Sequence, residues 1–121
     1  MTTTTGADIV RVLDTATLAF ITEDDLQQEL HTALAAAGIE STREVRLSDG
    51  RSRIDLLVGR VGIEVKTDGG RNDVIRQLMR YAHCDELDEL VLVTTRTKHH
   101  HMPTEVVGKS LRLVSLIGAS L

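Results

Sequence analysis

The sequence of 121 residues has few aromatic side chains, because Phe20 and Tyr81 are the only two and tryptophan is absent. Aliphatic and alanine side chains must therefore fill the interior. A surface that binds single-stranded nucleic acid by stacking needs several exposed aromatics, so such a surface is not expected. The single cysteine, Cys84, excludes a disulfide within the chain and is typical of a reducing compartment.

Long apolar runs are also missing, since no segment reaches the roughly 20 apolar residues that a membrane-spanning helix needs. The threonine-rich start lacks the basic and apolar regions of a signal peptide. We therefore expect an intracellular, cytoplasmic protein with no membrane partner. The length predicts one domain with its own core and no second module.

Acidic charge is concentrated in the first half of the chain. Residues 1–50 contain three basic and nine acidic side chains, whereas residues 51–121 contain eleven basic and nine acidic ones. The net charge of −4 therefore does not exclude a nucleic-acid partner for the second half.

Hydrophobic periodicity predicts an α/β domain with a poorly defined start, 1–21, a core, 22–95, and a loop with a C-terminal strand, 96–121. The order is helix, three-strand meander, helix, strand (αβββαβ), plus the extra strand, which we place at a sheet edge or in a dimer contact. This order predicts a three-layer sandwich in which helices flank a central mixed β-sheet. The predicted elements are helices 23–37 and 72–83 and strands 42–48, 53–58, 61–66, 90–95 and 109–116.

The hairpin over residues 53–66 carries the main chemical signal. Both arms alternate apolar and other residues, and a two-residue turn at Gly59-Arg60 fixes their register. Asp55 then faces Glu64, with Lys66 further along the same face. Facing like charges destabilise a strand pair, so carboxylates placed in this way indicate a divalent metal ion between them.

A further carboxylate could extend this pair. If the Asp49-Gly50 turn also has two residues, Val45 pairs with Ile54 and Glu44 lies opposite Asp55. Glu44 is thus a weaker candidate metal ligand. The alternatives are that it faces solvent beside an arginine, or that a bulge moves it out of the row.

Asp55, the Glu64-Val65-Lys66 tripeptide and the downstream Gln77-Leu78-Met79-Arg80-Tyr81 together resemble the PD-(D/E)XK nuclease superfamily. Ile54 stands where the family name has proline. The downstream segment looks like the QxxxY motif of the RecB-type branch, which includes phage-type exonucleases. The resemblance covers roughly residues 23–95.

This resemblance implies a restriction-endonuclease-like fold and a Mg²⁺-dependent nuclease that hydrolyses DNA phosphodiester bonds. Asp55, Glu64 and the Val65 carbonyl would hold Mg²⁺, for which Mn²⁺ could substitute, with no small-molecule cofactor. Lys66 would orient the attacking water. Family members often take a further acid from the first helix, and Glu29, on the shoulder of its apolar stripe, is the candidate catalytic residue and metal ligand. A solvated helix glutamate is an equal alternative.

Three residues are candidates for substrate binding. Gln77 could hydrogen-bond DNA or a site carboxylate, and Tyr81 could steady a phosphate or simply fill the core. Lys98 belongs to a basic loop, 96–101, that ends in three histidines. This loop is expected near DNA phosphates or as a solvated turn, because successive side chains diverge too much to share a metal.

Several kinds of function fit these residues. The nuclease could be structure-specific, such as a Holliday-junction resolvase, or a recombination, repair or phage-type enzyme. A restriction-type endonuclease and a non-catalytic DNA-binding or assembly module are the alternatives. We expect a homodimer, because the apolar C-terminal stretch suggests burial against a partner subunit. That stretch contains Leu111, Leu113, Val114, Leu116 and Ile117.

Overall fold

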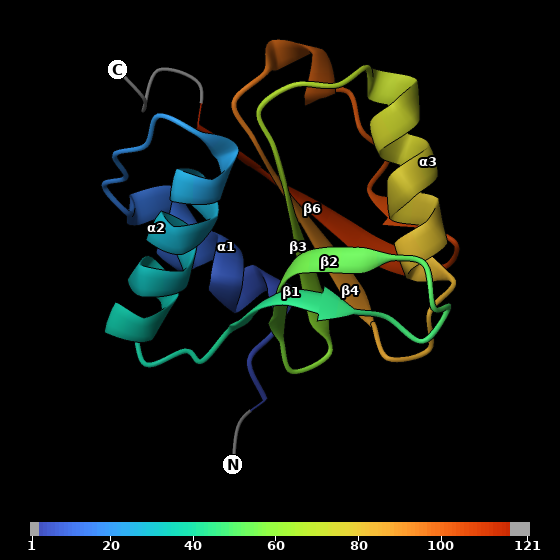
Figure 1. Cartoon of the computed structure of the whole chain (residues 1–121), viewed down its shortest axis with the longest axis horizontal. Coiled ribbons are helices and arrows are strands. Elements are labelled where there is room, and N and C mark those ends of the chain that lie inside the picture. The colour runs from blue at the N-terminus through green and yellow to red at the C-terminus, as the bar shows by residue number, and fades with distance from the viewer. Residues whose placement is uncertain (1–2, 117–121) are drawn as a thin grey trace.

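A six-stranded mixed sheet and three α-helices make up the protein, as a computed structural model describes for residues 3–116 (Figure 1). The sheet has the order β1-β2-β3-β4-β6-β5, with parallel pairing of β3 with β4 and of β4 with β6. The predicted α/β class and mixed sheet are confirmed. The helices are α1 (Gly6–Thr15), α2 (Glu23–Ala36) and α3 (Arg71–Ala82), with a 3-10 turn η1 (Thr97–His99). The strands are β1 (Thr42–Arg46), β2 (Arg53–Val58), β3 (Val61–Lys66), β4 (Glu89–Thr94), β5 (Glu105–Val106) and β6 (Lys109–Ser115).

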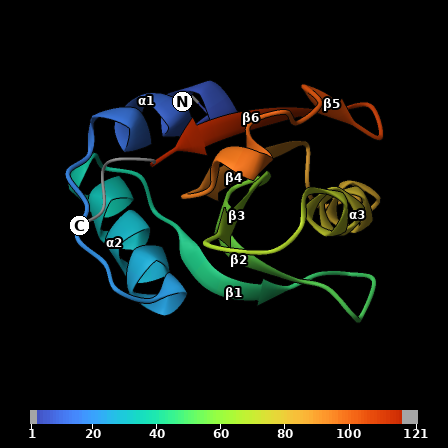
Figure 2. The same cartoon turned by 90° about the horizontal axis from the view of Figure 1, so that it is seen from above.

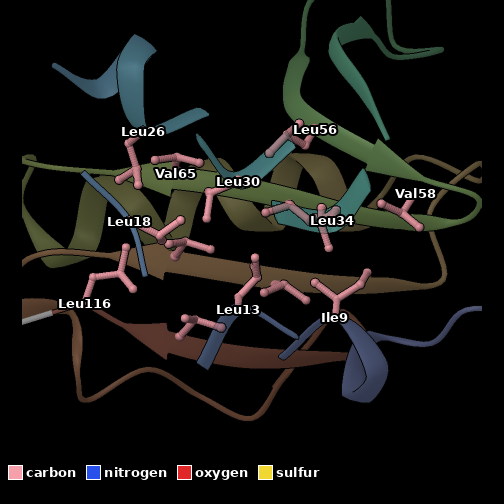
Figure 3. Close-up of a cluster of buried hydrophobic side chains, with 14 of the residues drawn as sticks. Ile9, Leu13, Leu18, Leu26, Leu30, Leu34, Leu56, Val58, Val65 and Leu116 are labelled. Carbon is pink, nitrogen blue, oxygen red and sulfur yellow. The ribbon is translucent and has the colours of Figure 1, made fainter. Parts of the chain in front are cut away.

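Helices cover both faces of the sheet. Figure 2 shows α1 and α2 on one side of β3 and β4, and α3 on the other. The first core lies under α1 and α2 and is aliphatic, with labelled members such as Leu13, Leu30 and Leu34 pointing toward the strands (Figure 3). The second core lies under α3 and contains Tyr81, Leu78 and Cys84. The two layers of helices thus enclose the sheet as the element order predicted.

The N-terminal segment is better defined than the sequence predicted. Thr5 caps α1 with a capping box, because its hydroxyl accepts from the Asp8 amide while the Asp8 carboxylate accepts from the Thr5 amide. Ile9 and Leu13 lie one helical turn apart and are completely buried in the first core. The first helix is therefore an integral part of the sandwich.

The last strand was predicted at a sheet edge or in a dimer contact, and the sheet-edge alternative is wrong. Strand β6 lies inside the sheet between β4 and β5. Leu111, Val114 and Leu116 are buried against the chain itself, with exposures of 5%, 0% and 4%. Ile117 lies outside the described residues. The apolar C-terminal stretch therefore gives no support to a homodimer.

No helix in the described part of the chain is both long and apolar enough to span a bilayer.

Candidate functional site

The hairpin of β2 and β3 has the predicted register but opens at Asp55. Its last paired residues are Leu56 and Ile63, and the predicted next pair, Asp55 opposite Glu64, does not form. Instead, the Val65 amide donates to Asp55 Oδ2 at 2.7 Å. Ile54 packs in the second core although Leu56 packs in the first, so β2 changes face at Asp55. Period-two alternation along the strand predicts Ile54 and Leu56 on one face, and this is wrong. The change of face holds Asp55 where the strands separate.

Glu64 is the buried centre of the site, with only 2% of its surface exposed. Its Oε2 accepts from the Tyr81 hydroxyl at 3.0 Å and forms an ion pair with Lys66 Nζ at 3.3 Å. Its Oε1 is buried and has no hydrogen-bond donor among the described residues. Buried carboxylate oxygens normally have a partner, so either a proton shared with Asp55 or a bound cation must satisfy this atom.

The two carboxyls of the hairpin cannot both be charged at low cost. Burial, and secondly the nearby Asp55 charge, raise the pKa of Glu64 to about 8. Burial also raises the pKa of Asp55, although the Val65 amide opposes that shift. Near neutral pH the pair therefore holds one proton, which Glu64 can share with Asp55. A bound cation would remove the need for that proton.

Tyr81 and Gln77 hold Glu64 in place from α3. Tyr81 is 1% exposed, and its hydroxyl lies within hydrogen-bonding distance of both Glu64 and the Arg53 carbonyl, the latter at 3.3 Å. Gln77 Nε2 donates to the same hydroxyl at 2.6 Å. Burial, and then the Glu64 charge, raise the pKa of Tyr81, so its proton stays in this network. Both residues therefore fix the position of the Glu64 carboxylate.

The acid that α2 brings to the site is Glu23, which the sequence interpretation missed. Glu23 Oε1 accepts from the backbone amide of Thr67 at 3.1 Å, directly after Lys66, and its charge acts on the pKa of Asp55. In Figure 1, α2 begins at the end of the molecule where β3 ends. Glu29 instead accepts a hydrogen bond at 3.2 Å from the Ala19 amide in the α1–α2 connection. At 1.5 Å per residue, it lies about 9 Å further along the helix.

Glu44 has the predicted register but does not complete a row of carboxylates. Val45 pairs with Ile54, as expected from the turn. Glu44, however, has a φ of 54°, and its carboxylate lies 3.6 Å from Arg53 and 4.0 Å from Arg43. Its side chain is 43% exposed, so the structure places it in a surface ion-pair cluster.

The histidine run was predicted as a surface loop or solvated turn, and for His99 this is wrong. His99 is completely buried, and its Nε2 lies 2.7 Å from the Gly69 carbonyl, to which it must donate. Its Nδ1, 2.6 Å from the Thr94 hydroxyl, then accepts. His99 thus ties the end of β4 to the loop after Lys66. Three adjacent histidines give no pattern from which the buried one could have been chosen.

The paired carboxylates are the oxygen ligands that this site offers to a cation. No group of three or more His, Cys, Asp or Glu side chains within residues 3–116 is arranged to hold a metal ion. Mg²⁺, however, is commonly bound through one or two carboxylates and keeps several waters. The unpartnered Oε1 of Glu64 beside Asp55 supplies oxygen ligands of that kind.

The family resemblance rests on these residues alone. Comparison with protein-family models, with curated proteins and with solved structures gave no match.

Proposed function

We propose that this protein is a Mg²⁺-dependent nuclease that hydrolyses DNA phosphodiester bonds, with a restriction-endonuclease-like fold. The observation that carries the proposal is the buried, unpartnered Oε1 of Glu64 beside Asp55, with the Lys66 ammonium 3.3 Å from the other oxygen of Glu64. A purely structural hairpin gains nothing from placing Asp55 next to the buried Glu64, because the two carboxylates repel.

Each residue would have a distinct role. Asp55, Glu64 and the Val65 carbonyl would hold Mg²⁺ or Mn²⁺, with Glu23 as an additional acid close by. The ion, when bound, lowers the pKa of a coordinated water and neutralises phosphate charge. Lys66, whose side chain is 21% exposed, lies at the border between the buried carboxylate and solvent. Its ammonium can orient the attacking water and offset negative charge on the phosphate.

The test is a cleavage assay on linear duplex, nicked, single-stranded and four-way-junction DNA. Each substrate is incubated with Mg²⁺, Mn²⁺, Ca²⁺ or EDTA. We expect cleavage with Mg²⁺ or Mn²⁺ and none with EDTA. Preference for the junction would support a resolvase-type enzyme, and degradation from ends a phage-type exonuclease. DNA binding without cleavage under every condition would contradict the proposal and favour a non-catalytic module.

Lys66→Ala should lower the cleavage rate about 100-fold or more while leaving the metal site intact, because Lys66 acts on water and phosphate. Its charge also lowers the pKa of Glu64, so metal binding should be measured above pH 8 by calorimetry. Lys109→Ala is the matched control, because Lys109 begins β6 at the opposite end of the parallel strands. If Lys66→Ala weakened metal binding by the same factor as it lowered the cleavage rate, the role of Lys66 in orienting water and offsetting phosphate charge would be contradicted.

A further inference from the structure

Two basic side chains converge on one carboxylate beside the proposed site. Lys98 Nζ lies 3.2 Å, and Arg96 Nη2 3.8 Å, from the same oxygen, Asp68 Oδ1. The three side chains are 43%, 49% and 78% exposed, respectively. Exposed ion pairs contribute little to stability, so a stronger anion can displace Asp68 at small cost.

The backbone around these cations forms an open hollow of about 310 Å³, lined by Thr95, Arg96, Thr97 and Lys98. The hollow adjoins the proposed site, because the Thr95 amide donates to the Lys66 carbonyl at 3.2 Å. Arginine and threonine side chains together offer the donors that phosphate oxygens accept. A phosphate here would lie one strand away from Glu64, since β3 and β4 are neighbours.

Buried contacts fix both sides of this hollow. His99, next to Lys98, is hydrogen-bonded to the carbonyl of Gly69, next to Asp68. The Thr94 hydroxyl accepts from the Arg96 amide at 3.0 Å and lies 2.6 Å from His99. The cations and the competing carboxylate are therefore held facing each other, while their side chains stay open to solvent.

We propose that Arg96 and Lys98, with the hollow between them, form a subsite for a backbone phosphate of the substrate strand, and that Asp68 is an exchangeable internal anion there. The phosphate chemistry follows from the residues, while its assignment to a DNA strand rests on the proposed nuclease function. Two cations against one carboxylate leave one positive charge, which matches one phosphodiester. Asp68 would thus limit binding to phosphates that also engage the neighbouring site.

The first test uses inorganic phosphate and does not depend on nuclease activity. In a ¹⁵N NMR titration, the amides of residues 95–98 should shift, and Asp68→Asn should bind phosphate about threefold or more tightly. Arg96→Ala and Lys98→Ala should each weaken those shifts. Arg60→Ala and Asp88→Asn are matched controls, because this pair lies at the other end of β3, about 20 Å away. No shift at residues 95–98, even in Asp68→Asn, would overturn the subsite.

The second test uses oligonucleotides and fluorescence anisotropy with the Glu64→Gln variant. Arg96→Ala and Lys98→Ala should each reduce the slope of log affinity against log salt by about 0.7 for single strands. The reduction should be the same for 5′-phosphorylated, 3′-phosphorylated and unphosphorylated strands. A reduction confined to one phosphorylated end would overturn the assignment to an internal phosphate.

The two proposals fail in different ways. Phosphate shifts at residues 95–98 without cleavage of any DNA would reject the nuclease and keep the phosphate site. Metal-dependent cleavage, with salt slopes of Arg96→Ala and Lys98→Ala equal to wild type, would reject the subsite and keep the nuclease.

Discussion

Glu64→Gln should lower the rate of metal-dependent cleavage by about 10³-fold or more. The same substitution should stabilise the metal-free protein at pH 8. The pKa of Glu64 is raised from 4.5 to about 8 in the folded state, mainly by burial. Below pH 4.5 both folded and unfolded chains hold the proton. Between these values only the folded chain holds it, so the free energy of unfolding falls as pH rises, by at most about 1.4 kcal/mol per unit. Glutamine cannot ionise, so the variant should lack this fall.

Urea unfolding in EDTA from pH 4 to 9 measures this effect. Wild type and Glu64→Gln should have similar stability at low pH and diverge as pH rises. Asp55→Asn should also abolish cleavage. It should stabilise the metal-free protein less than Glu64→Gln does, because only the amide oxygen of asparagine can keep accepting the hydrogen bond from the Val65 amide. Glu105→Gln, on an exposed glutamate of β5, is the control. Cleavage retained by Glu64→Gln, or an unchanged pH dependence of its stability, would contradict the site.

Strand pairing around the hairpin could be predicted because local rules determine it. A two-residue turn at Gly59-Arg60 and period-two alternation leave one register, and the observed pairs follow it from Val58–Val61 to Leu56–Ile63. The same rules could not show that β2 changes face at Asp55. That change arises from the separation of the strands and the Val65 hydrogen bond to the Asp55 side chain, which are tertiary features.

The sequence also did not predict that the segments near both ends of the chain, α1 and β6, are buried. The periodicity of β6 predicts a strand, but whether it lies at an edge depends on a partner as short as β5. Likewise, the apolar side chains Ile9 and Leu13 indicate a buried helix face only once β6 and β4 are present beneath α1. In both cases the missing information is which distant segment supplies the partner surface.

The sequence pointed to Glu29 and missed Glu23 for a geometric reason. A helical wheel gives the direction in which a side chain points around the helix axis, but not the position of its residue along that axis. Glu29 has a suitable direction, yet the carboxylates of the hairpin lie near the first turn of α2, where Glu23 binds Thr67. Knowing that α2 begins where β3 ends would have selected Glu23.

Glu23→Gln should therefore lower the cleavage rate about 10- to 100-fold, while Glu29→Gln should leave it nearly unchanged. The amide oxygen of the substituted side chain could still accept from Thr67, so a purely structural role of Glu23 would predict little change. Loss of the negative charge near Asp55 should weaken Mg²⁺ binding, which calorimetry measures separately from the rate. Glu29→Gln makes the same chemical change in the same helix and is the matched control, and Glu44→Gln should act only weakly, because its carboxylate pairs with arginines. A larger loss of metal affinity in Glu29→Gln than in Glu23→Gln would show that the first-helix acid has been misassigned.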